Sequence, residues 1–159
     1  MNRNDYALLF CCHEPTPSFK ILVNTIKEYG WEVDYSFSID DLFQKLSQKP
    51  QYYDFLIIDV LFPVPQECNH ISFTLQELKE MRDGLNTGVV CAKKILREVD
   101  RDYSIILTSL RDINISSDPE LKGYFCDYLR KPFMTQELDQ LLCDMIGKYH
   151  IEYWDKQEY

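Results

Sequence analysis

The sequence lacks a long apolar run. Nowhere does it contain about 18 uninterrupted apolar residues, the length that a membrane-spanning helix needs. Its opening residues, Met-Asn-Arg-Asn-Asp-Tyr, also lack the apolar region of a secretory signal peptide. We therefore expect a cytoplasmic protein with no membrane partner.

Basic residues are scarce relative to acidic ones. The chain carries 17 Lys and Arg against 26 Asp and Glu, and its formal net charge is −9. Binding to a phosphate backbone depends on clustered cations, so this balance argues against a nucleic-acid partner. Proteins or small ions are the expected partners.

Glycine is also rare, and the cysteines show no pairing pattern. None of the five glycines lies in residues 13–19, the loop after the first apolar run. A loop that cradles a cofactor phosphate needs glycine, because its backbone amides must approach the phosphate closely. This argues against a cofactor-binding enzyme. The six cysteines are scattered, mostly within apolar runs, so we expect reduced thiols, most of them in the core.

The chain does contain alternating strand and helix patterns. The run Phe-Leu-Ile-Ile at residues 55–58 has no polar alternation and ends in Asp59, which predicts a strand buried on both faces. Strands are expected at residues 6–12, 31–37, 55–59, 104–108 and 124–129, and helices at 19–29, 39–49, 89–99, 118–123 and 135–147. The alternation predicts an α/β fold: a flavodoxin-like, doubly wound sheet of five parallel strands in the order 2-1-3-4-5. The 159 residues are expected to form one domain with a core over residues 5–147.

Polar residues follow the predicted strands at one edge of this sheet. In a doubly wound sheet, ligands bind beyond the carboxyl ends of the strands, near the switch between strands one and three. The residues that reach this edge are Cys12, His13, Glu14, Asp59, Thr108 and Lys131. We therefore expect a functional site there.

Three motifs at these strand ends resemble the receiver domain of two-component response regulators. The motifs are Asp59-Val-Leu-Phe-Pro63, Ile106-Leu-Thr108-Ser109 and Tyr128-Leu-Arg-Lys131-Pro132-Phe133, and the resemblance covers nearly all of residues 5–147. It implies that Asp59 accepts a phosphoryl group from a histidine kinase or a phosphotransfer protein. Thr108 would then be the switch hydroxyl, Lys131 the ammonium that neutralises the phosphoryl group, and Tyr128 the switch aromatic.

The resemblance also implies a role for the whole chain. The expected protein is a stand-alone signalling module that switches protein partners and is not an enzyme. Receivers often pair through one face, so a homodimer is an alternative to a monomer, and the output partner is unknown. The residues of that face are Tyr128, Arg130 and Gln140.

The chain departs from that family at the end of strand one. In the family, two acidic residues at this place hold magnesium. The matching positions are Cys12 and His13, with Glu14 next. Glu14, Asp59 and His13 could hold a divalent cation. Because magnesium prefers hard oxygen ligands, we expect these residues to bind magnesium only weakly. We expect magnesium to bind no more tightly than about 1 mM.

The same departure leaves two alternatives open. His70 follows strand three, two residues from Cys68. Together with His13, Cys12, Glu14 and Asp59, it would suit zinc better than magnesium, although the spacing matches no zinc signature. The alternative function is a pseudo-receiver, which keeps the fold and acts as a phosphorylation-independent protein interaction module.

Two segments lie outside the resemblance. Residues 64–83, called the insertion below, are longer than the short loop that usually follows strand three. Thr74 and Glu77 form a capping-box pattern, which predicts an extra short helix over residues 75–82. Its apolar residues are expected to pack on the core: Leu75, Leu78 and Met81. Residues 148–159 form a C-terminal extension, expected either to continue the last helix or to dock a partner.

Overall fold

The computed structural model describes residues 2–99 and 103–155, and the side chains of the last helix as far as Lys148. Within these residues, five strands form one parallel sheet in the predicted order β2-β1-β3-β4-β5. The strands are β1 (Ala7–Cys11), β2 (Glu32–Ser36), β3 (Phe55–Asp59), β4 (Ser104–Ser109) and β5 (Cys126–Arg130). The helices are η1 (Arg3–Asp5), α1 (Pro17–Glu28), α2 (Ile39–Gln48), α3 (Leu75–Glu80), α4 (Thr87–Glu98), η2 (Ile115–Ser117) and α5 (Thr135–Asp155). No described helix is long and apolar enough to cross a membrane.

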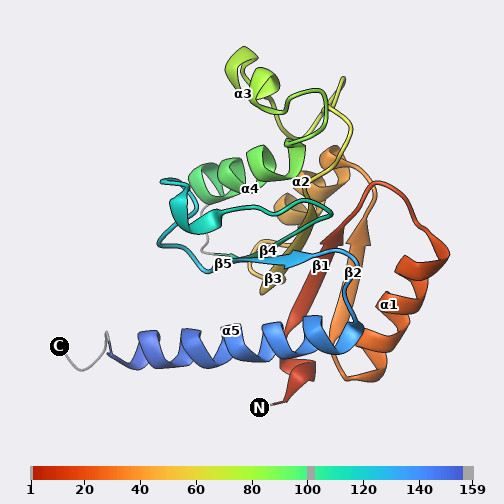
Figure 1. Cartoon of the computed structure of the whole chain (residues 1–159), viewed down its shortest axis with the longest axis vertical. Coiled ribbons are helices and arrows are strands. Elements are labelled where there is room, and N and C mark those ends of the chain that lie inside the picture. The colour runs from red at the N-terminus through yellow and green to blue at the C-terminus, as the bar shows by residue number, and fades with distance from the viewer. Residues whose placement is uncertain (1, 100–102, 156–159) are drawn as a thin grey trace.

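Helices cover both faces of the sheet (Figure 1). The α1 and α5 helices lie on one face, and α2 and α4 lie on the other. Alternate residues of β3 serve the two layers: Leu56 and Ile58 pack with α2 and α4, while Phe55 and Ile57 pack with α1 and α5. Both faces of β3 are therefore apolar, which explains why its sequence shows no polar alternation.

The segment between β4 and β5, residues 110–125, is called the β4–β5 loop below. The helix predicted for residues 118–123 is wrong, because the loop contains only η2 and a turn. Asp118 explains the difference: its Oδ1 accepts hydrogen bonds from Glu120 N (2.9 Å) and Leu121 N (3.3 Å). A side chain that satisfies nearby backbone amides favours a turn over a helix. Leu121 anchors this turn in the core.

The last helix is longer than predicted. Its expected end at Gly147 is wrong, since α5 continues to Asp155. A glycine inside a helix costs about 1 kcal/mol relative to alanine and does not by itself end the helix. The C-terminal extension therefore continues α5, and residues 156–159 lie outside the described residues. A docking role for it stays a prediction.

The insertion forms the predicted extra helix, α3, which stands beyond α4 in Figure 1. Its capping box is confirmed: Glu77 N donates to Thr74 Oγ1 (3.1 Å), and Thr74 N donates to Glu77 Oε2 (2.8 Å). The predicted apolar stripe is only partly correct, because Met81 is fully buried whereas Leu75 is 79% exposed. Leu75 lies about 200° around the helix from Glu77. Since Glu77 faces α4, Leu75 faces solvent.

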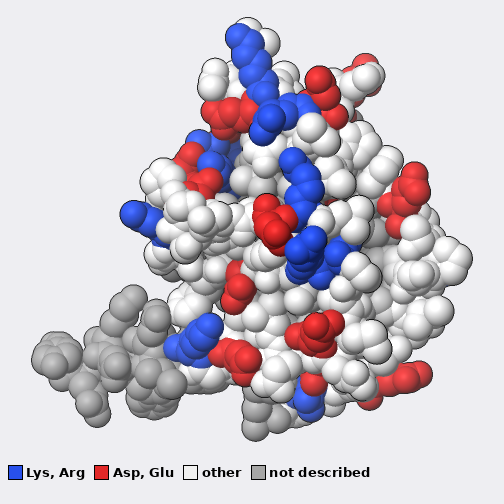
Figure 2. Space-filling view, in the orientation of Figure 1, with Lys and Arg blue, Asp and Glu red and all other residues white. Residues whose placement is uncertain are grey.

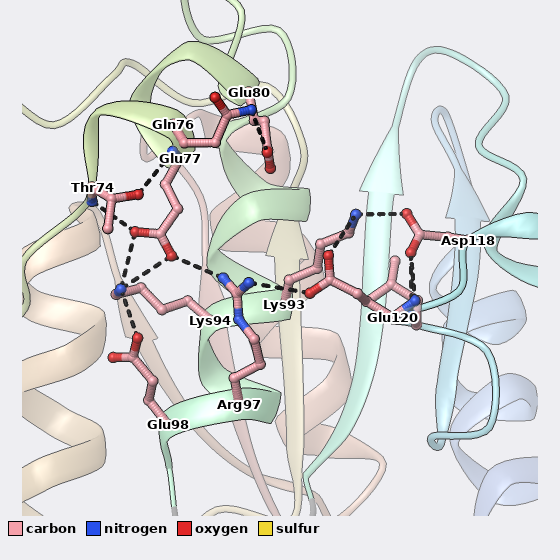
Figure 3. A network of polar contacts seen from close by, with 11 residues as sticks. Thr74, Gln76, Glu77, Glu80, Lys93, Lys94, Arg97, Glu98, Asp118 and Glu120 are labelled. Carbon is pink, nitrogen blue, oxygen red and sulfur yellow. Dashed lines mark hydrogen bonds and ion pairs between the residues drawn. The ribbon is translucent and has the colours of Figure 1, made fainter.

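Ion pairs hold α3 against α4, and the sequence did not predict them. The buried Glu77 carboxylate contacts Lys94 Nζ (3.2 Å from both oxygens) and Arg97 Nη2 (2.8 Å), as Figure 3 shows. Acidic and basic side chains accordingly lie next to each other over α3 and α4 (Figure 2). The insertion is thus fixed to the domain core by a buried charged group as well as by Met81.

Candidate functional site

Asp59 is the last residue of β3 and lies beside Thr108 of β4 in the parallel register. Its side chain is 18% exposed. The start of α4 comes close to it: Gly88 N donates to Val60 O (3.0 Å), and a Cβ at Gly88 would lie 2.0 Å from Asp59 O. Only glycine fits this contact. The α4 helix therefore begins against the strand end that carries the carboxylate.

Two side chains contact the Asp59 carboxylate, and both contact the same oxygen. Lys131 Nζ lies 2.6 Å from Oδ1, and Thr108 Oγ1 donates a hydrogen bond to that same Oδ1. Among the described residues, none donates a hydrogen bond to Oδ2. The ammonium and the hydroxyl thus fix the carboxylate through one oxygen and leave the other oxygen unengaged.

The groups around Asp59 are held by the neighbouring strand ends. Lys131 N donates to Ser109 O (2.8 Å), which continues the β4–β5 ladder and places the ammonium beside β3. Tyr128 is half-buried on β5, and its hydroxyl donates to Arg111 O (2.7 Å) in the β4–β5 loop. The predicted switch aromatic therefore contacts the loop that follows the predicted switch hydroxyl.

Arg111 also belongs to this region, and the sequence reasoning missed it. Its guanidinium donates to Leu85 O, the carbonyl just before the start of α4. Its backbone N donates to Ser109 Oγ (3.0 Å). The available signal was its position, because a basic residue three places after Thr108 must lie on the same edge of the sheet.

An open pocket adjoins the carboxylate. The residues that line it are Cys12, His13, Glu14, Thr16, Phe19, Asp59 and Lys131. Burial, followed by the negative charge of Asp59, raises the pKa of the Cys12 thiol to about 12. The thiol lies 3.6 Å from Glu14 O, to which it donates. The His13 ring packs against Phe62, with 5.5 Å between ring centroids.

Two of these side chains, Cys12 and His13, are poor ligands for magnesium. A thiol with so high a pKa stays protonated near neutral pH, and neither a thiol nor an imidazole is the hard oxygen ligand that magnesium prefers. Within the described ranges, no three His, Cys, Asp or Glu side chains are grouped so that they could hold a metal ion. Glu14, His13 and Asp59 thus share the pocket without forming a ligand group.

The wider zinc set is not brought together either. His70 Nδ1 lies 2.9 Å from Asp40 Oδ2, and Asn69 N and His70 N both donate to Asp40 Oδ1 (2.8 Å each). Asp40 belongs to the first turn of α2. Because His70 and its backbone are engaged there, His70 fixes the insertion to α2 and does not line the Asp59 pocket.

Solved structures share the fold of this chain. No family model and no curated protein matches the chain. A putative response regulator from Chloroflexus aurantiacus J-10-fl is 24% identical, with a TM-score of 0.60 over 89% of this chain and 98% of that one. The chain has the receiver fold. The chemotaxis protein CheY4 of Vibrio cholerae is 18% identical, with a TM-score of 0.61 over 88% and 98% of the two chains. The receiver domain of the hybrid histidine kinase CckA is 14% identical, with a TM-score of 0.55 over 87% and 97%.

The receiver fold accounts for how the predicted site residues are distributed. Asp59, Thr108 and Lys131 come from three adjacent strand ends and are in direct contact. Tyr128 is joined to the site through the β4–β5 loop, where its hydroxyl donates to Arg111 O. The fold thus brings together the carboxylate of Asp59, the ammonium of Lys131 and the hydroxyl of Thr108.

Proposed function

We propose that this chain is a receiver-like signalling protein that accepts a phosphoryl group on Asp59 and thereby switches its protein partners. The observation that supports the acceptor role is the arrangement of the carboxylate. Lys131 and Thr108 both bind Oδ1, so Oδ2 is the oxygen that can attack phosphorus. The donor would be a histidine kinase or a phosphotransfer protein, and the output protein is unidentified.

The chemistry follows from these groups. Oδ2 of Asp59 forms a bond to phosphorus while the bond from phosphorus to the donor breaks, and the leaving group keeps that electron pair. Lys131 neutralises part of the charge that spreads over the phosphoryl oxygens. The Thr108 hydroxyl then turns from Oδ1 to a phosphoryl oxygen. Because Thr108 is the last but one residue of β4, this turn moves the start of the β4–β5 loop.

A second function is favoured by a specific observation. By the resemblance, Cys12 and His13 match the positions at which the receiver family has acidic metal ligands. The high pKa of the Cys12 thiol keeps it protonated, and the His13 ring packs on Phe62. A pseudo-receiver would keep the protein partners and dispense with the phosphoryl group. A homodimer through the face of Tyr128, Arg130 and Gln140 suits either function.

Intact mass separates the two functions. The protein is incubated with acetyl phosphate, with and without magnesium and manganese, and weighed. We expect one phosphoryl group on the wild-type chain and none on Asp59→Asn. Asp112→Asn is the matched control, because Asp112 lies on the same rim but its side chain is 77% exposed. An unlabelled wild-type chain would support the pseudo-receiver, and equal labelling of Asp59→Asn would move the acceptor elsewhere.

A further inference from the structure

The β4–β5 loop contacts the segment just before α4. Arg111 donates to Leu85 O, and Tyr128 donates to Arg111 O. The loop begins at Leu110, two residues after Thr108, whose hydroxyl binds Asp59. Arg111 therefore joins the residues of the candidate site to the chain that leaves the insertion.

The same loop contacts the far end of α4 through ion pairs (Figure 3). Lys93 Nζ lies 2.8 Å from Asp118 and 3.6 Å from Glu120, and Arg97 lies 3.3 Å from Glu120. Arg97 also contacts Glu77 of α3 at 2.8 Å. One guanidinium thus bridges the β4–β5 loop and the insertion.

The chain bends at residues 82–84, where the insertion leads into α4. Arg82, Asp83 and Gly84 have φ values of 52°, 54° and 95°. Residues other than glycine rarely adopt this left-handed backbone conformation, so Arg82 and Asp83 are held there by their surroundings. Phe62 N donates to Gly84 O (3.1 Å) and Asn86 N donates to Met81 O (2.9 Å). The insertion returns to α4 through a strained bend whose next residue, Leu85, is the one that Arg111 holds.

We propose that the insertion is a regulatory arm of the Asp59 site, coupled to it through the β4–β5 loop. The loop takes one position when Thr108 binds Asp59, and in that position it holds Leu85 and Arg97. When Thr108 leaves Asp59, the loop moves, and the contacts that fix α3 to α4 weaken. The proposal rests on the proposed function only for what moves Thr108, namely phosphorylation of Asp59. The coupling between the loop and the insertion exists in the unmodified protein as well.

The experiment measures amide hydrogen exchange of residues 74–86 in unmodified, full-length protein. Thr108→Val removes the hydroxyl and keeps the shape of the side chain. We expect it to speed exchange in this segment by at least about fivefold, the lower range of measured coupling between sites. The double variant Arg111→Ala/Glu120→Gln removes the two contacts that lead from the loop to the insertion, Arg111–Leu85 and Glu120–Arg97, and leaves the Lys93–Asp118 pair on α4. In that background, Thr108→Val should change exchange of residues 74–86 less than about twofold.

Glu98→Gln is the matched control. Glu98 pairs with Lys94 in the same network (2.8 Å), and among the described residues it makes no ion pair with the β4–β5 loop. The Glu98→Gln background should therefore keep the full response to Thr108→Val. Thr108→Ala repeats the measurement should the valine variant not fold.

Each outcome decides the coupling independently of phosphorylation. Unchanged exchange of residues 74–86 in Thr108→Val, or an equal response in the double variant, would refute the regulatory arm even if Asp59 accepts a phosphoryl group. Conversely, the expected pattern in a protein that acetyl phosphate fails to label would support the arm and refute the acceptor role.

Discussion

Glu77 and Asp59 are two of the carboxylates with cationic partners in this molecule, and they are held in opposite ways. Glu77 in the insertion uses both oxygens: Oε1 contacts Lys94 and Arg97, and Oε2 contacts Lys94 and Thr74 N. Asp59 uses one oxygen, which binds both Lys131 and Thr108. Both oxygens of Glu77 are engaged, whereas no described residue donates a hydrogen bond to Oδ2 of Asp59, which lines an open pocket. Under the proposed function, Oδ2 is the oxygen that reacts.

The pKa of Glu77 is shifted although its contacts are structural. Burial raises the pKa of Glu77, but the hydrogen bond from Thr74 N and the contacts with Lys94 outweigh it, and the net pKa is lowered. Structural ion pairs shift pKa values as active sites do. Here the shift marks the group that fixes the insertion, and the free oxygen of Asp59 marks the candidate site.

The largest expected effect comes from neutralising Glu77. Glu77→Gln leaves the buried Lys94 with Glu98 alone, and removing one partner of a buried pair costs about 3 kcal/mol. Urea denaturation should show this loss in the free energy of unfolding. Glu98→Gln, at the half-exposed end of the same network, should cost at most about 1 kcal/mol. Equal losses in the two variants would mean that Glu77 is not the central group.

Acid should remove the Glu77 contribution. Its pKa is lowered in the folded protein, so its stabilisation is complete above the unfolded value of about 4.5 and is lost as pH falls through the folded pKa. The difference in unfolding free energy between wild type and Glu77→Gln should therefore shrink below that pH. A difference that stays constant in urea titrations from neutral pH into acid would contradict the assignment.

Neutralising Asp59 should matter much less for stability. Asp59→Asn keeps an oxygen that can accept from Thr108, and the Lys131 side chain is already 35% exposed to water. We expect a change in unfolding free energy of less than about 1 kcal/mol. A loss as large as that of Glu77→Gln would remove the contrast between the two carboxylates.

The last expected effect is weak binding of magnesium. Cys12 and His13 offer no hard oxygen ligand, so magnesium should bind no more tightly than about 1 mM, or about −4 kcal/mol. Titration calorimetry with magnesium and then zinc checks this. Micromolar magnesium affinity would show that Glu14 and Asp59 suffice as ligands and would restore an ordinary receiver pocket.

The sequence predicted the sheet order and the positions of Asp59, Thr108 and Lys131, because strand ends in a parallel sheet share one edge. It also predicted the α3 cap, since a capping box is local. It failed for residues 118–123, where Asp118 binds backbone amides and makes a turn. It also missed the Arg97 bridge, because ion pairs between distant segments have no signal in one sequence.

The most direct test of the contrast is to map the phosphoryl group after incubation with acetyl phosphate, by tandem mass spectrometry of proteolytic peptides. We expect label on the peptide that contains Asp59, none on the peptide that contains Glu77, and no label anywhere in Asp59→Asn. Label at another carboxylate, or label that persists in Asp59→Asn, would contradict this expectation.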